Sequence, residues 1–136
     1  MVFRRFIEGR RRRHVAHRLY STIIEAARRP AFYTRLGVPD TLDGRFELIV
    51  LHAHAVMRRL KAEGGVHAPA ARALSQALFD LMFADMDQNL RELGVSDMSV
   101  GKRVKQMAKA FYGRAAAYDA GVAASDLKVD APPRPE

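Results

Sequence analysis

The residues of this sequence with metal-binding potential are its histidines. His14 and His17 are three residues apart, and His52 and His54 are two apart. Residues two apart on a helix point in nearly opposite directions, so His52 and His54 cannot share one metal ion there. His14 and His17 could share one, but the arginines around them would repel a cation. We therefore predict no metal site, with the histidines solvated or at the edge of a core.

Three aspartates, Asp80, Asp85 and Asp87, lie in the most apolar part of the chain. Asp80 and Asp87 are two helical turns apart on one stripe, and Arg91 follows one turn later. Asp80 and Asp87 are either functional, as an acid pair or as an anionic notch that faces a partner, or structural, as a polar seam that holds Arg91 or another basic neighbour. We favour the polar seam.

Other catalytic patterns are absent from the sequence. It contains no cysteine, which excludes disulfides, thiolate zinc sites and cysteine nucleophiles. It has no Gly-rich phosphate loop, no dinucleotide fingerprint, no Ser/His/Asp order and no Glu-x-x-His pair of the di-iron proteins. We predict a binding protein rather than an enzyme, with no catalytic residue and no cofactor.

The formal net charge of +8 is unevenly distributed. Residues 1–29 hold nine arginines against Glu8 and Glu25, residues 40–97 have more acidic than basic side chains, and residues 98–118 hold five basic side chains and no acid. Two basic ends therefore flank an acidic middle. This asymmetry indicates an anionic partner, either a nucleic acid or a membrane surface.

One basic surface is predicted near the C-terminal end, where Lys102, Lys105, Lys109 and Tyr112 occupy one stripe of a helix. We call these four residues the basic stripe. It is either a solvated face or a docking surface for RNA or an acidic protein.

The other basic surface lies at the N-terminus, where aromatic and apolar residues interleave with arginines. Its members are Phe3, Arg4, Arg5, Phe6, Ile7, Arg10, Arg11, Arg12 and Arg13. Such a segment suits an anionic membrane surface, because the arginines attract the lipid headgroups while the apolar side chains insert. A disordered basic arm and an organelle-targeting segment are the alternatives.

The pattern of apolar residues predicts an all-α, single-domain bundle of about four to five helices. Helices are expected over 12–29, over 41–63 with Thr41 as N-cap, over 69–93 with Gly94 as the cap at its end, and from Ser96 or Ser99 to about Tyr118 with Phe111 on its inner face. A short helical turn is expected over 30–36. Residues 1–13 form a basic arm or anchor, 14–119 the helical domain and 120–136 a flexible tail. No stretch is long and apolar enough to span a membrane, and no secretory signal is present.

The helix expected over 69–93 is apolar nearly all round near residue 80. Such a helix is either central in the core or partly covered by a partner. As partner-binding candidates on it we take Phe79, Met82, Phe83 and Met86 together with Asp80 and Asp87. Core packing is the simpler explanation for the methionines.

Three stretches resemble one known family. They are 32–46, which contains LGVPDTLDGRF, 83–95, which reads FADMDQNLRELGV, and 100–114, which begins VGKRVKQM and ends FYGR. Over residues 15–120 the sequence resembles the ubiquinol–cytochrome c chaperones, the assembly factors of the cytochrome bc1 complex.

The resemblance implies a helical chaperone that binds newly made cytochrome b or an early bc1 intermediate. It also implies possible contact with the ribosome, a small partner protein, and a peripheral place at the cytoplasmic side of the inner membrane, or in mitochondria for a eukaryotic chain. Two alternatives stay open, an RNA- or ribosome-binding module and a metal- or quinone-dependent helical enzyme.

Overall fold

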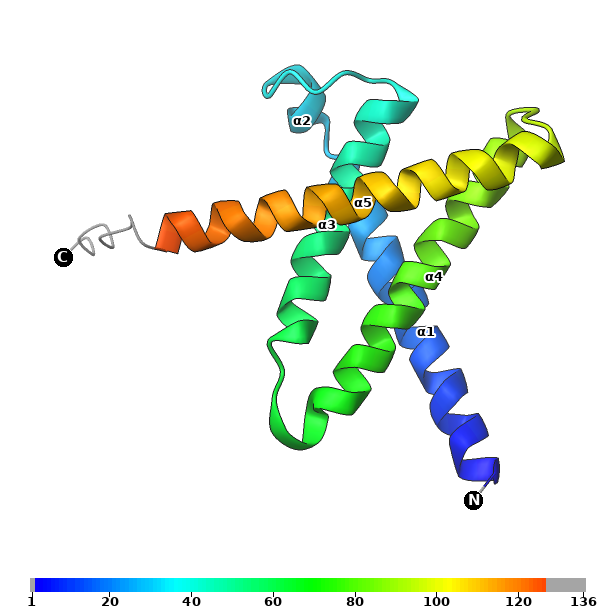
Figure 1. Ribbon diagram of the computed structural model, residues 1–136, viewed down its shortest axis with the longest axis vertical. Helices are drawn as coiled ribbons and strands as arrows, with labels where there is room; N and C mark the ends of the chain where they lie inside the picture. The colour runs from blue at the N-terminus through cyan, green and yellow to red at the C-terminus, as the bar shows by residue number, and fades with distance from the viewer. Residues whose placement is uncertain (1, 127–136) are drawn as a thin grey trace.

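The computed structural model describes residues 2–126, and every regular element within them is helical (Figure 1). The elements are α1 (Val2–Ala27), α2 (Pro30–Thr34), α3 (Leu42–Lys61), the short 3-10 turn η1 (Gly65–His67), α4 (Ala68–Glu92) and α5 (Asp97–Asp126). The predicted all-α, single-domain fold is confirmed.

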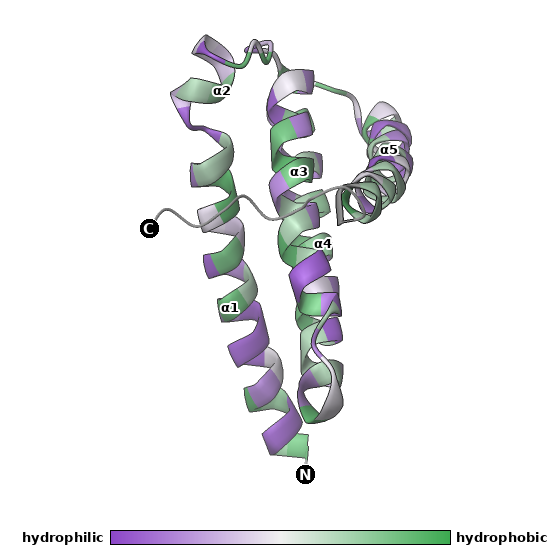
Figure 2. Ribbon diagram, turned by 90° about the vertical axis from the view of Figure 1, so that its left-hand side faces the viewer, coloured by the Kyte–Doolittle hydropathy of each residue, from purple (hydrophilic) through white to green (hydrophobic). Residues whose placement is uncertain are grey.

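The helices form three layers. Helices α1, α3 and α4 pack against one another, and α5 crosses α3 and α4 on the side away from α1 (Figures 1 and 2). Helix α4 therefore has α1 on one side and α5 on the other, with α3 beside it. This central position explains why α4 is apolar nearly all round.

The core is formed by side chains from all four long helices. Its buried members are Tyr20 and Ile23 of α1, Phe46, Val50 and Ala53 of α3, Leu78, Met82, Phe83 and Met86 of α4, and Phe111 of α5. Burying a large apolar side chain contributes roughly 1.5–3 kcal/mol, so α4 supplies the largest share of this stabilisation.

Two predicted helix ends are confirmed in detail. The Thr41 hydroxyl accepts a hydrogen bond from the backbone N–H of Gly44 at 3.1 Å and thereby caps α3. At the end of α4, Gly94 has a φ of 85°, its N–H donates to the carbonyl of Arg91, and the N–H of Val95 donates to that of Leu90. This pair of bonds is the Schellman arrangement that ends helices at glycine.

Gly44 allows the loop before α3 to lie directly on the helix. A Cβ atom at this position would stand 1.9 Å from the carbonyl oxygen of Pro39. Only glycine permits this approach, so Gly44 fixes residues 39–41 against the first turn of α3.

Two helices are longer than the sequence predicted. Helix α1 begins at Val2 rather than near residue 12, because arginine is a good helix former and Gly9 alone does not break the helix. Helix α5 continues past Tyr118 to Asp126, because the alanines after residue 114 outweigh Gly121. The predicted tail is thus helical over 120–126, and residues 127–136 lie outside the described part. The division into arm, domain and tail stays a prediction.

Candidate partner-binding surfaces

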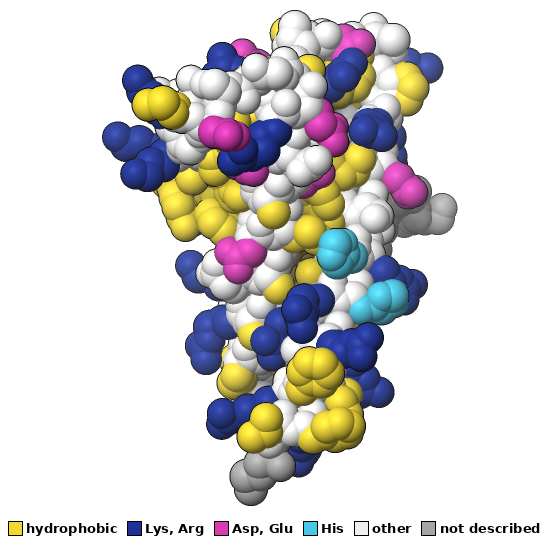
Figure 3. All heavy atoms as spheres, turned by 90° about the vertical axis from the view of Figure 1, so that its right-hand side faces the viewer, with side chains coloured by type: hydrophobic (Ala, Val, Ile, Leu, Met, Phe, Trp, Pro, Cys, Tyr) yellow, Lys and Arg dark blue, Asp and Glu magenta, His cyan; other side chains and the backbone are white. Residues whose placement is uncertain are grey.

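The first half of α1 carries no buried residue. From Val2 to Val15 every side chain is exposed, and only Gly9 is partly covered. Phe3 and Phe6 are 75% and 55% exposed, and Ile7 is also exposed. Figure 3 shows apolar side chains gathered at this end of the molecule with basic side chains around them. The structure therefore places the predicted N-terminal surface on a projecting helix.

The apolar side of this projecting half continues the core-facing side of α1 only in part. At about 100° per residue, Val2, Phe3, Phe6 and Ile7 share one side of the helix. Phe3 and Ile7 lie more than a quarter turn from the buried Ala16 and Tyr20 further along, whereas Val2 lies in line with Tyr20. The guanidinium of Arg10 lies over the Phe6 ring, 5.8 Å from its centroid. The N-terminal apolar side thus faces solvent.

The basic stripe lies on the outer face of α5. Lys102, Lys105 and Lys109 are exposed, and none of them forms an ion pair within the described part of the chain. Tyr112 is 62% exposed, and its ring lies 5.7 Å from that of Phe79 on α4. On the opposite side of α5, Phe111 is buried as predicted. The stripe therefore faces solvent, and its role in binding stays a prediction.

The six candidates on α4 do not form one surface. Met82, Phe83 and Met86 are buried in the core, which the position of α4 between α1 and α5 explains. Phe79 is half-buried, with its ring 4.6 Å from that of Phe83. The exposed Asp80 accepts a hydrogen bond from Gln76 at 2.9 Å. In this structure the three buried residues serve packing, and only the helix periphery is open to a partner.

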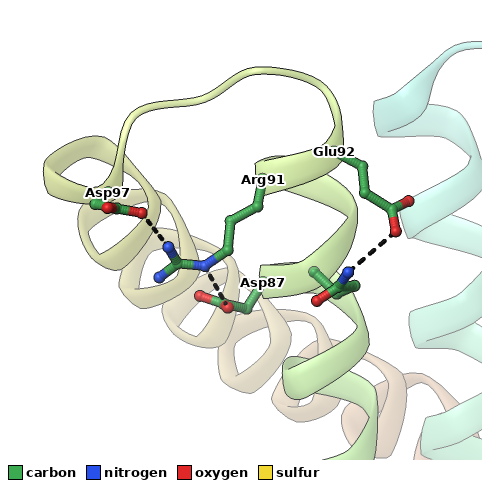
Figure 4. Close-up of polar contacts among 5 residues, drawn as sticks. Asp87, Arg91, Glu92 and Asp97 are labelled. Atoms are coloured by element: carbon green, nitrogen blue, oxygen red, sulfur yellow. Dashed lines mark hydrogen bonds and ion pairs between the residues drawn. The ribbon is translucent and has the colours of Figure 1, made fainter.

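Asp87 belongs to a polar seam at the turn between α4 and α5. The Arg91 Nε donates to Asp87 Oδ2 at 2.9 Å, and its Nη1 donates to Asp97 at the start of α5 (Figure 4). The hydrogen bond to Asp87 is the main cause that raises the pKa of Arg91 above its usual range. The seam interpretation of Asp87 fits these contacts, since Arg91 ties the end of α4 to α5.

Further polar contacts tie α5 to α3. Arg114 of α5 makes a two-pronged ion pair with Glu47 of α3. Asp119 Oδ1 accepts from Arg58 Nη1 at 2.7 Å and lies 3.1 Å from Nε2 of the buried His54. The Arg58 bond, together with His54, lowers the pKa of Asp119. These contacts fix how α5 crosses the bundle.

The histidines are not brought together. His52 Nδ1 lies 2.7 Å from the carbonyl of Leu48, and His54 is engaged with Asp119. His14 and His17 are exposed on α1. Within residues 2–126, no three His, Asp or Glu side chains gather closely enough to hold a metal ion. None of the helices in this range combines the length and the apolar character needed to cross a lipid bilayer.

A cleft of about 730 Å³ opens where the end of α1, α2, the start of α3 and the end of α4 meet. Apolar and charged side chains line it together, among them Ile24, Arg28, Asp40, Leu42, Arg45, Phe46, Ile49, Asp85, Met86, Glu92 and Leu93. The side of the molecule shown in Figure 3 carries apolar side chains between α1 and α4 in its upper half, with acidic and basic ones among them.

Asp85 lies in this cleft and contacts the core through a tyrosine. The hydroxyl of Tyr20 on α1 donates to Asp85 Oδ2 at 2.5 Å. Burial, followed by the hydrogen bond to Asp85 and by its charge, raises the pKa of Tyr20 well above 10.0. Asp85 is half-buried, and Tyr20 is its only hydrogen-bonding or ionic partner among the described residues.

The cleft was not predicted from the sequence. Asp85 stood out only as one of three aspartates in an apolar segment, and the predicted pairing concerned Asp80 and Asp87. Its partner Tyr20 is 65 residues away in the chain, and no spacing rule connects the two. The signal in the sequence that could have identified Asp85 was a carboxylate directly before Met86, on a helix whose apolar residues face the core.

Comparisons with known proteins point to one family. The family model described as ubiquinol-cytochrome C chaperone matches residues 34–130. Ubiquinol-cytochrome c reductase complex assembly factor 1 from Mus musculus is 27% identical over 82% of this chain and 36% of its own length. The protein of similar name from Xenopus laevis is 25% identical over 82% of this chain and 54% of its own.

The structural comparison agrees with the sequence comparisons. The crystal structure of the Cbp3 homolog from Brucella abortus is similar with a TM-score of 0.75 and 40% sequence identity, over 93% of this chain and 68% of that one. The chain spans between about a third and about half of the length of the mouse and frog relatives.

Proposed function

Because this chain belongs to the ubiquinol-cytochrome C chaperone family, we propose that it is an assembly chaperone for the cytochrome bc1 complex. In this proposal it binds newly made cytochrome b, or an early assembly intermediate, while it is peripherally attached to the inner membrane. It acts by binding rather than by catalysis. The relatives from mouse and frog are themselves named as assembly factors of ubiquinol-cytochrome c reductase.

The observation that carries the membrane part of the proposal is the projecting half of α1. Its exposed Phe3, Phe6 and Ile7 can insert into a bilayer, while the arginines on either side meet anionic headgroups. Each arginine near an anionic leaflet contributes about 1 kcal/mol. The first turn of α1 holds arginines and no acidic residue, so the positive end of the helix dipole is uncompensated within α1. An anionic surface would supply that compensation.

The experiment that tests the function is deletion of the gene in the organism from which the sequence comes. We expect the amount of assembled bc1 complex to fall while other respiratory complexes keep their normal amounts. Expression of the full chain should restore the complex, and a variant with Phe3, Phe6 and Ile7 changed to serine should restore it only in part. Normal bc1 levels in the deletion strain would refute the proposal.

The basic stripe supports a second contact, with the ribosome or another RNA-containing partner. Its three lysines carry no ion pair within residues 2–126, and Tyr112 beside them offers a ring for stacking. Changing the three lysines to alanine should weaken RNA binding and make it less dependent on salt. Absence of RNA binding at low salt would remove this contact and leave the chaperone proposal intact.

A further inference from the structure

The cleft at the end of the bundle combines an apolar lining with a carboxylate that lacks a cation. Ile24, Phe46 and Ile49 contribute apolar surface from α1 and α3. Asp85 keeps one carboxylate oxygen on the Tyr20 hydroxyl and has no ion-pair partner within residues 2–126. Two other carboxylates line the cleft and differ from Asp85. Asp40 is paired with Arg45 at 2.8 Å, and Glu92 is exposed to solvent and accepts a hydrogen bond from Gln88 at 3.1 Å.

A molecule that fills this cleft must compensate the charge and the hydrogen-bonding capacity of the Asp85 carboxylate. A purely apolar occupant would remove the remaining water from a half-buried carboxylate and leave its charge uncompensated, which is costly. A lysine or arginine on the occupant would supply both the opposite charge and the hydrogen-bond donors. Arg28 also lines the cleft, and its charge reaches the Tyr20 hydroxyl, but its side chain is exposed and forms no ion pair with Asp85. Water therefore screens both its attraction to Asp85 and its repulsion of an incoming cation.

The occupant must also satisfy its own backbone. The described part of the chain contains no strand, so the cleft offers no sheet edge to which an extended peptide could bond. A helix needs no such edge, because its backbone hydrogen bonds are internal. A helix that lays an apolar face into a groove is an established mode of recognition.

Two exposed leucines enlarge the apolar surface of the cleft at its rim. Leu93 at the end of α4 is 66% exposed, and Leu42 at the start of α3 is also exposed. We propose that this cleft binds a helical segment of a partner protein that carries an apolar face and one lysine or arginine, with Asp85 as the counter-ion of that residue. This inference rests on the proposed chaperone function for the identity of the partner, a membrane protein, but not for the binding chemistry.

The direct test measures binding of two fluorescent peptides to the full chain. Each is a leucine- and alanine-rich helix of about 18 residues, or about five turns. One carries a single central lysine, and the other carries norleucine at that position. We expect the lysine peptide to bind the wild type about tenfold more tightly or better, because a desolvated charge pair is lost with norleucine. In the Asp85→Asn variant this preference should vanish.

Matched controls separate the site from general effects. Asp40→Asn should keep the lysine preference, since Asp40 already has a cation in Arg45. Leu93→Gln should weaken both peptides, whereas Met98→Gln, at a position that is 92% exposed and outside the cleft lining, should weaken neither. Circular dichroism should show unchanged helix content in Asp85→Asn, because an amide oxygen can still accept from Tyr20.

Three results would overturn the inference. They are equal affinity of the wild type for both peptides, a lysine preference that survives in Asp85→Asn, and a wild-type dimer that Leu93→Gln dissociates, which would assign the cleft to a second copy of this chain. In the deletion strain, full restoration of the bc1 complex by Asp85→Asn would also refute it while leaving the chaperone function standing. Normal bc1 levels after deletion would refute the function alone, and the peptide measurements would still decide the cleft.

Discussion

Helix α4 and the first half of α1 are similar in composition but opposite in burial. Both mix large apolar side chains with charged ones, yet Leu78 and Met82 of α4 are fully buried while Phe3 of α1 is mostly exposed. The difference lies in their neighbours, because α4 has helices on either side (Figure 2) whereas no residue from 2 to 15 is buried. An apolar composition indicates that a surface is stabilised by burial, and the packing decides whether the chain itself or another molecule buries it.

The largest expected effect breaks the core on α4. Leu78→Ala removes a fully buried side chain at the centre of the bundle and should lower the free energy of unfolding by about 2–5 kcal/mol. Phe3→Ala, a larger truncation at an exposed site, should change it by less than about 0.5 kcal/mol. Urea denaturation of both variants checks this, and a comparable loss in Phe3→Ala would show that the N-terminal half of α1 packs against the protein.

The second prediction concerns the exposed side of α1. Changing Phe3, Phe6 and Ile7 to serine should reduce binding to anionic phospholipid vesicles by about a thousandfold or more, because roughly 1.5–3 kcal/mol is lost for each large side chain that no longer inserts. Thermal stability should not change.

A matched triple variant controls for general loss of apolar surface. Leu36, Leu93 and Met98 are also exposed apolar residues, but they lie far along the chain from the N-terminal arginines. Changing them to serine should leave vesicle binding as it is. Equal losses in the two triple variants would count against the N-terminal half of α1 as the membrane-binding surface.

The third prediction uses two glycines. Gly44→Ala places a Cβ atom 1.9 Å from the Pro39 carbonyl, so the loop that borders the cleft must move, and stability should fall by about 1–3 kcal/mol. Gly9→Ala has nothing within 4 Å and should raise stability by about 0.5 kcal/mol through better helix formation. Thermal unfolding of both variants measures the contrast, and equal effects would show that loop and helix are not in close contact.

The sequence predicted the local features of this fold well. The Thr41 cap, the end of α4 at Gly94 and the inward side of α5 at Phe111 all depend on residues within a turn or two of each other, which spacing rules describe. The ends of α1 and α5 were missed because residues 1–13 were taken as a basic arm or anchor and residues 120–136 as a flexible tail, although arginine and alanine have strong helix propensity.

The contacts between distant segments could not be predicted in this way. Asp85 and Tyr20, or Asp119 and His54, meet only because of how the helices cross, and a single sequence carries no record of that crossing. For the same reason the sequence could not separate the buried residues of α4 from its exposed ones, because apolar residues occur on nearly every side of this helix. The candidate cleft, made by four elements, lay beyond the reach of the pattern.

The smallest expected effect tests the Tyr20–Asp85 contact through pH. Because the folded state raises the pKa of Tyr20 above 10.0, the folded protein holds the phenol proton more tightly than the unfolded chain does. The resulting stability is fully present below about pH 10 and is lost as pH rises further, by at most about 1.4 kcal/mol per pH unit. Tyr20→Phe should cost about 1 kcal/mol near pH 8 and remove this part of the alkaline decline.

The control for this measurement is Tyr112→Phe, which changes an exposed phenol and should keep the wild-type dependence on pH. Denaturation at about pH 8 and about pH 11 gives the two stabilities for each protein, and only their difference between variants is interpreted, since lysines titrate in the same range. If the stability of Tyr20→Phe declines with pH as steeply as that of the wild type, the hydrogen bond to Asp85 does not hold the phenol proton of Tyr20. Asp85 would then have no hydrogen-bond partner from α1, and the lysine of a bound partner protein would be the first side chain to pair with it in the cleft.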